Sequence, residues 1–153
     1  MKTYEATLLA AVLSISALGL AKEKAISRSD LPPAVEKSLQ QQLSGATVKG
    51  FSAEKESGRV MYEAQLIVDG HSKDILFDAS GAIEEVEEEV AFDSLPVEVK
   101  ASLRARAKAG KITKVESLTK QDKLVAYEAQ VDKNGKRSEI QVGPKGERLL
   151  TEV

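Results

Sequence analysis

Residues 62–66 read YEAQL and residues 127–131 read YEAQV, so one short segment occurs twice in the chain, 65 positions apart. The segment LPPAVEKSL at residues 31–39 likewise returns as LPVEVKASL at residues 95–103, with five of nine positions identical at an offset of 64. A repeated order of segments is typical of a duplicated structural unit. We therefore predict two copies, residues 31–93 and residues 94–153, with almost no linker between them.

Each copy is predicted to begin with a helix. A Leu-Pro pair opens both segments, and proline fits the first helical turn because its missing N–H has no partner there. Apolar residues then recur every four positions, which predicts a helix of about 12 residues with one buried stripe. Asp30 and Ser94 stand just ahead of these helices as candidate caps. The stripe residues are Leu31, Val35, Leu39 and Leu43 in the first copy and Leu95, Val99 and Leu103 in the second.

The rest of each copy is predicted to form strands. Residues 60–68 and residues 125–131 alternate between apolar and other side chains, as strands with one buried face do. Asp69-Gly70 and Asn134-Gly135 are dipeptides favoured in tight hairpin turns. The predicted fold class is therefore α+β, with two tandem α-β-β-β-β repeats, each a helix packed on one face of an antiparallel sheet. The remaining strands are expected at residues 47–53, 75–77 and 83–86, and at residues 112–117, 140–142 and 149–153.

The N-terminus is predicted to be a signal peptide, residues 1–21. Residues 6–21 carry no charge, follow Lys2 and precede Lys22, which is the layout of a secretory signal. These 16 positions are short for a spanning helix, which needs roughly 20 apolar residues. Cleavage after Ala21 would leave residues 22–30 as an N-terminal segment, with no stable membrane insertion. We expect a periplasmic or secreted protein; an uncleaved N-terminal anchor is the alternative.

Composition argues against several kinds of chemistry. The chain has no Cys and one His, and its formal charge is −2, far from the basic balance of a nucleic-acid binder. No Gly-x-Ser-x-Gly elbow or Gly-rich phosphate loop is present, and no second His could share a zinc ion. His71 follows a predicted turn and is interpreted as a solvated turn residue. We predict no enzyme activity, no catalytic residues, no metal ligands and no cofactor.

The order Leu-Pro-x-x-Val-x-x-x-Leu, then Tyr-Glu-Ala-Gln, then Asp-Gly or Asn-Gly, resembles the PepSY-like family, whose domains are similar to the repeats of the secreted beta-lactamase inhibitor protein. The resemblance covers residues 31–153. It implies two sheets side by side that form a concave surface able to receive a protein, and it implies no catalytic residues. The inhibitor's contact loops have no counterpart motif here, and its disulfides cannot form without Cys, so inhibition of a beta-lactamase is not implied.

The expected partner is a protein or peptide held on the concave sheet face, as by an inhibitor or regulator of an extracytoplasmic protein. A plain solvent-facing surface remains the alternative, because antiparallel sheets tolerate water on one side. The candidate binding residues are those predicted to point away from the helices, namely Met61, Glu63, Gln65 and Leu76 in the first copy and Glu128, Gln130 and Gln141 in the second.

Acidic residues are concentrated in the first copy. The run EEVEEE at residues 84–89 holds carboxylates of the kind that hard cations bind, so a cation- or small-ligand-binding envelope protein is the alternative function. A solvated strand end that guards an exposed sheet edge is the other interpretation of this run. Residues 31–94 hold 13 acidic and 5 basic residues, whereas residues 95–153 hold 8 and 13. Opposite charges on the two copies would attract each other or orient a partner.

Overall fold

The computed structural model describes residues 23–149. The predicted signal peptide, residues 1–21, lies outside the described residues, and so does most of the strand predicted at residues 149–153.

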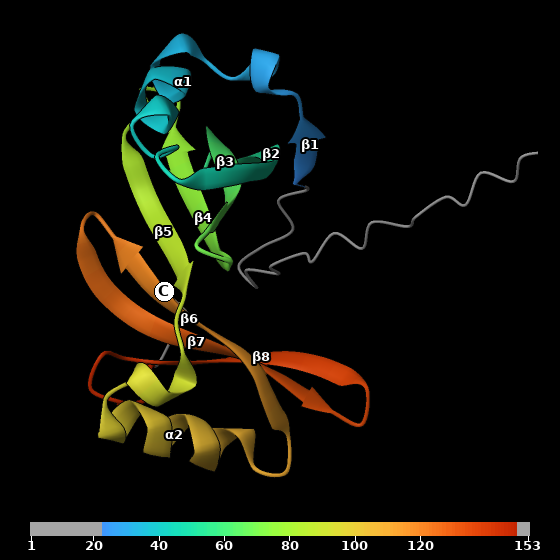
Figure 1. The fold of residues 1–153 in the computed structure, drawn as a ribbon, viewed down its shortest axis with the longest axis vertical. Coiled ribbons are helices and arrows are strands. Elements are labelled where there is room, and N and C mark those ends of the chain that lie inside the picture. Colours follow the sequence, from blue (N-terminus) through green and yellow to red (C-terminus); the bar gives the residue numbers. More distant parts are fainter. Residues whose placement is uncertain (1–22, 150–153) are drawn as a thin grey trace, which may run out of the picture.

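Residues 23–149 contain two α-helices, two short 3-10 helices and one eight-stranded sheet (Figure 1). The strands follow one another in sequence order, and every pair is antiparallel. The predicted α+β class is confirmed. The elements are β1 (Lys24–Ile26), η1 (Arg28–Asp30), α1 (Pro33–Gln40), β2 (Ala46–Glu56), β3 (Arg59–Val68), β4 (His71–Asp78), β5 (Ile83–Glu89), η2 (Phe92–Ser94), α2 (Val97–Ala107), β6 (Lys111–Lys120), β7 (Lys123–Lys133) and β8 (Lys136–Val142).

The helices begin later than the sequence predicted. Pro32 and Pro96 are the N-cap residues of α1 and α2, and neither helix has a side-chain cap. Asp30 and Ser94 lie instead in η1 and η2, so the expectation that they cap the helices is wrong. The residue before a proline is pushed to extended backbone, which stops each helix from starting upstream. The helices are accordingly 8 and 11 residues long rather than about 12.

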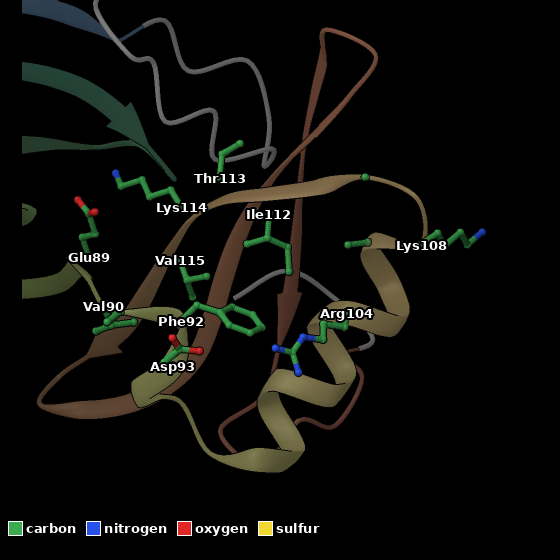
Figure 2. A pocket seen from close by; sticks show the side chains of 13 residues that line it. Glu89, Val90, Phe92, Asp93, Arg104, Lys108, Ile112, Thr113, Lys114 and Val115 are labelled. Atoms are coloured by element: carbon green, nitrogen blue, oxygen red, sulfur yellow. The ribbon is translucent and has the colours of Figure 1, made fainter.

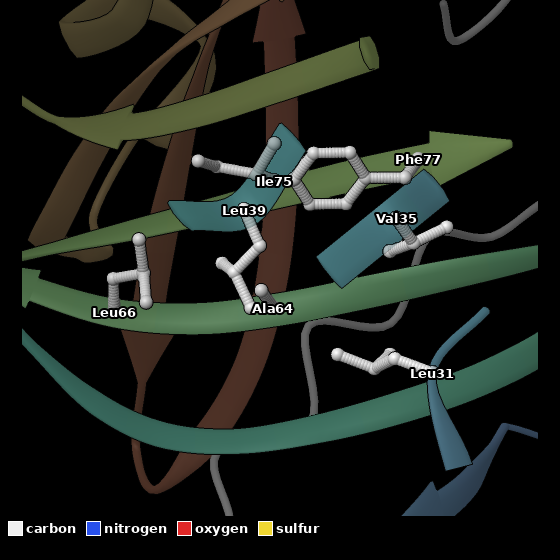
Figure 3. Close-up of a cluster of buried hydrophobic side chains, with 7 residues drawn as sticks. All are labelled: Leu31, Val35, Leu39, Ala64, Leu66, Ile75 and Phe77. Atoms are coloured by element: carbon white, nitrogen blue, oxygen red, sulfur yellow. The ribbon is translucent and has the colours of Figure 1, made fainter. Parts of the chain in front are cut away.

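Each helix buries its predicted apolar stripe against the sheet. In the first half, Val35 and Leu39 of α1 are 1% and 0% exposed and pack over the strands (Figure 3). This cluster comprises Leu31, Val35, Leu39, Ala64, Leu66, Ile75 and Phe77. A second cluster around α2 comprises Leu95, Val99, Leu103, Val115, Ala129 and Val142.

The pairing of β5 with β6 makes one sheet of the two halves, a point that the sequence left open. Five residue pairs join these strands, from Glu85↔Lys120 to Glu89↔Glu116. Val86 packs against the α1 cluster and lies opposite Thr119, which shares its side of β6 with Val115 in the α2 cluster. Both helices therefore cover the same face of the continuous sheet.

The other face, here called the helix-free face, follows from strand alternation. It runs without interruption across both halves of the sheet. Its residues are Ser52 on β2; Met61, Glu63 and Gln65 on β3; Asp74 and Leu76 on β4; Glu85, Glu87 and Glu89 on β5; Lys114, Glu116 and Leu118 on β6; Ala126, Glu128 and Gln130 on β7; and Glu139 and Gln141 on β8.

Two turn glycines lie directly beneath the helices. Gly81 has φ +83° and Gly146 has φ +78°. A Cβ atom on Gly81 would overlap the Ala34 carbonyl group of α1, and one on Gly146 would overlap the Glu98 carbonyl group of α2. These turns need glycine both for the backbone conformation and for the close approach of the helix.

We expect Gly81→Ala and Gly146→Ala each to lower the free energy of unfolding by roughly 2–4 kcal/mol, since a strained backbone adds to steric overlap. Gly70→Ala and Gly135→Ala are matched controls, because both positions have positive φ but no atom within 4 Å of the new Cβ. They should cost only about 1 kcal/mol, the backbone part alone. Urea unfolding measures all four; equal losses at the four sites would contradict this account of the turns.

Candidate functional site

All seven predicted binding residues lie on the helix-free face. Cross-strand pairing sets Glu63 opposite Leu76 and Glu128 opposite Gln141. Met61 points to this face as expected, but it is only 1% exposed, so it is not accessible to a partner in this structure. Leu118 and Ala126, on the same face, are equally buried, at 2% and 0% exposed. The remaining six predicted residues, Glu63, Gln65, Leu76, Glu128, Gln130 and Gln141, are half-buried.

Several of these polar side chains hold one another in place. Glu63 accepts hydrogen bonds from the Ser52 hydroxyl at 3.1 Å and from the Gln65 amide at 3.2 Å. Glu128 accepts one from the Gln141 amide at 2.6 Å. A side chain fixed in this way loses less conformational entropy when it binds a partner.

Three acidic residues lie at the centre of this face. The acidic run at residues 84–89 indicated Glu87, but no sequence pattern pointed to Asp74 or Glu116 beside it. Asp74, Glu87 and Glu116 bring carboxylate oxygens within 4.8 Å of one another. Asp74 lies opposite Glu87, and Glu116 reaches them because β5 pairs with β6. Strand alternation offered a signal, since Val86 in the core places its neighbours Glu85 and Glu87 on the opposite face. The contribution of Glu116 depended on a strand pairing that the sequence does not show.

The run of acidic residues at positions 84–89 is part of a central strand. It lies in β5, which extends three residues beyond the predicted strand at 83–86 and pairs with β4 on one side and β6 on the other. The interpretation of this run as a strand end guarding an exposed edge is therefore wrong. Opposite the run, β6 supplies lysines: Lys120 pairs with Glu85 at 2.9 Å, and Lys114 pairs with the buried Glu116.

Burial raises the pKa values of Glu87, Glu63 and Asp74 on this face. The pKa of Glu87 rises to about 9, chiefly through loss of solvation and then through the charges of neighbouring carboxylates. Burial, followed by the charge of Asp74, raises the pKa of Glu63 to about 7. The pKa of Asp74 rises to about 6 by burial, against the opposing effect of nearby Lys114. Near neutral pH the centre of the face thus carries protonated as well as ionised carboxyl groups.

His71 is placed as expected. It is exposed at the start of β4, and its Nδ1 lies 3.8 Å from Glu89 Oε1. Glu89 in turn accepts hydrogen bonds from the backbone N–H and the hydroxyl of Ser72.

We expect the protein to become less stable as pH rises from about 5 to 9. The pKa of Glu87 is higher in the folded state than in an unfolded chain, where it is about 4.3, so the folded state holds its proton more strongly and this advantage disappears as pH rises through the folded value. Glu87→Gln, neutral at every pH, should therefore raise the free energy of unfolding at about pH 8 by on the order of 1 kcal/mol or more, and should have little effect near pH 4.

Urea unfolding across this pH range measures the effect, and the exposed Glu56→Gln serves as a control that should show no such pH dependence. A gain from Glu87→Gln of the same size at pH 4 and pH 8 would refute the assignment.

This chain is similar to a known protein family and to several solved structures. Residues 60–149 match the family model described as "Putative beta-lactamase-inhibitor-like, PepSY-like". No curated protein matches the chain. None of the helices in residues 23–149 combines the length and the apolar character that a membrane span requires.

Several solved structures have a similar fold. A protein of Bacteroides eggerthii, provisionally assigned to the periplasm, is 19% identical with a TM-score of 0.62, covering 76% of this chain and 84% of its own. A BLIP-like protein of Bacteroides fragilis is 22% identical with a TM-score of 0.58, covering 78% and 83%. A DUF2874 family protein of Bacteroides ovatus is 17% identical with a TM-score of 0.59, covering 78% and 86%. At these identities the likeness concerns the fold.

Proposed function

The chain belongs to the beta-lactamase-inhibitor-like, PepSY-like family, and from this membership we propose that it is a non-enzymatic, extracytoplasmic binding module. Its partner is a protein or peptide held on the helix-free face of the sheet, and its role is to inhibit or regulate that partner. The observation that carries the proposal is the continuity of this face across both halves of the sheet, with no helix on it in residues 23–149.

The chemistry of the face supports a protein partner. It combines polar side chains already fixed by hydrogen bonds, such as Glu63 and Glu128, with the half-buried apolar side chain of Leu76. Protein interfaces have this mixed character, and pre-ordered side chains reduce the entropic cost of binding. The acidic residues at its centre favour a partner with a basic surface.

Export supports the same proposal. The uncharged residues 6–21 between two lysines are typical of a signal peptide, and an exported chain acts in the periplasm or outside the cell. The similar fold of a Bacteroides eggerthii protein that is provisionally periplasmic agrees with this location.

We also infer that the chain is a tandem repeat of one α-β-β-β-β unit, residues 31–93 and 94–153. The recurring sequence segments are supported by matching structural details. Each half has an irregularity between its first two sheet strands, at Val48/Gly50 and at Ile112/Lys114. Each half also has a turn glycine beneath its helix. Most of the predicted fourth strand of the second unit, residues 149–153, lies outside the described residues.

Site-specific photo-crosslinking in the envelope of the cells that carry the protein tests the binding proposal. A photo-reactive side chain at Gln65 or Gln130 should capture one and the same partner, because both positions lie on the helix-free face. The same group at Lys37 or Ala101, exposed on the helices, is the matched control and should capture none of it.

The double variant Glu63→Gln/Glu128→Gln should weaken this capture about tenfold, whereas Glu56→Gln/Asp122→Asn, which removes the same charge from exposed sites elsewhere, should not. Capture from the helix positions alone, or an equal loss in both double variants, would place the partner elsewhere and reject the proposal.

Cation binding is the second candidate function, favoured by one specific observation. The carboxylates of Asp74, Glu87 and Glu116 lie close enough together to share one ion, and hard cations such as calcium prefer oxygen ligands. Of the run at residues 84–89, only Glu87 belongs to this group. The raised pKa of Glu87 means that a cation would displace a proton there.

Thermal unfolding with and without millimolar calcium separates the two functions. A cation site predicts a rise of several degrees in the melting temperature, larger at pH 8 than at pH 6, because an ion bound to the folded state stabilises it. Asp74→Asn should abolish the rise, and Asp69→Asn, in an exposed turn, should preserve it. No rise, or the same rise in both variants, rules out this site.

A further inference from the structure

A cleft of about 580 Å³ opens beside α2, where η2, the end of α2 and the start of β6 meet (Figure 2). Its volume falls within the range of roughly 300–1,000 Å³ typical of ligand sites. The lining is mixed: beside polar and charged groups it contains apolar side chains of the second cluster and short side chains at the rim. The apolar lining residues are Val90, Ala91, Phe92, Ala107, Ile112 and Val115.

One wall of the cleft is a sheet edge without a partner strand. The pairing of β5 with β6 ends at Glu89↔Glu116, followed by a single hydrogen bond from the Val90 N–H to the Val115 carbonyl at 2.9 Å. Residues 111–114 continue β6 beyond that point, and within residues 23–149 no strand pairs with them on this side. An extended peptide can add to such an edge through main-chain hydrogen bonds.

Five charged residues line the cleft, namely Glu89, Asp93, Arg104, Lys108 and Lys114. Glu89 accepts hydrogen bonds from Ser72, and Lys114 pairs with Glu116, both on the helix-free side of the sheet. Within residues 23–149, Arg104 and Lys108 form no ion pair. These two basic residues are therefore available to a negatively charged ligand.

Arg104 is held in a defined position. Its guanidinium carbon lies 4.8 Å from the centre of the Phe92 ring, a cation–π contact, and Figure 2 shows both side chains at the cleft. The Arg104 guanidinium beside the apolar Phe92 ring can pair with a carboxylate while Phe92 contacts an apolar group. A ligand in which a carboxylate and an apolar group are close together therefore fits this arrangement.

We propose that this cleft binds the carboxyl terminus of a peptide that ends in an apolar residue. The terminal carboxylate pairs with Arg104, and Lys108 adds positive charge at the rim of the cleft. The last side chain packs on Phe92 and Ile112, and the main chain extends along residues 112–114 of β6. Edge addition and capture of a terminal carboxylate are established modes of peptide recognition. This site lies on the helix side of the sheet and does not depend on the function proposed for the helix-free face.

Titration calorimetry tests the proposal with a short acetylated valine–threonine peptide that ends in leucine. The free acid should bind, and the amidated peptide should bind at least tenfold more weakly because it lacks the terminal charge. N-methylation of the backbone near the C-terminus should weaken binding to a similar extent, since it removes main-chain hydrogen bonds. Dodecanoate serves as an apolar carboxylate without a peptide backbone; binding of dodecanoate but not of the peptide overturns the proposal.

Protein variants locate the site. Arg104→Gln/Lys108→Gln should reduce affinity for the free acid at least tenfold and leave the weak binding of the amide unchanged, whereas Arg104→Lys should retain most of the affinity. Lys133→Gln/Lys136→Gln removes the same charge from the exposed β7–β8 hairpin and should have no effect. Chemical shifts of Ile112 and Thr113 amides should move with the free acid. Equal losses in the two double variants, or no binding of the free acid, would refute the proposal.

Discussion

The pairing of β5 with β6 is the constraint on which the rest of the molecule depends. Each half has its own helix and its own apolar cluster, and Val90 and Phe92, at the end of the first half, pack against the second cluster. The five residue pairs between Glu85–Glu89 and Glu116–Lys120 turn two sheets into one. They place both helices on one face, leave the other face continuous, and end early enough to expose the start of β6.

The same pairing brings together groups that repel each other. Asp74 and Glu87 come from the acidic half, and β6 adds Glu116, which is almost fully buried. Lys114 offsets Glu116 within β6. Lys120 of the second half pairs with Glu85 of the first, and Lys114 also opposes the rise that burial causes in the pKa of Asp74, so basic residues of β6 compensate acidic residues of the first half where the halves meet. The Lys120–Glu85 pair is thus one attractive contact between the oppositely charged halves, and its distance is well below the screening length of about 8 Å. Glu87 holds a proton near neutral pH because its pKa is raised, and this removes part of the negative charge that no lysine offsets; losing that proton at higher pH lowers stability.

Local sequence patterns predict the helices and the faces of the strands, but they do not predict which strands pair. The recurrence of apolar residues every four positions located the buried stripes of both helices, and the alternation around Tyr62 and Tyr127 assigned the faces of β3 and β7 correctly. The capping roles of Asp30 and Ser94 failed because a proline fixes the backbone before it and delays the helix. The cluster of Asp74, Glu87 and Glu116 was not predicted, because it forms only when β4, β5 and β6 lie side by side, and a local sequence pattern does not show which strands pair. Met61 lies on the predicted face of β3 but is buried, because neighbouring parts of the structure cover it, and alternation along β3 alone does not predict this.

The two faces of the sheet differ in chemistry. On the helix-free face carboxylates dominate, and several are fixed by hydrogen bonds, so the recognition proposed there would depend on charge complementarity. On the helix side, the cleft at α2 combines apolar side chains, a strand edge without a partner in residues 23–149, and basic side chains, so the recognition proposed there would depend on burial and main-chain pairing. β6 contributes to both, because its alternating residues Lys114 and Val115 point to opposite faces. β6 is therefore the strand that the two surfaces share.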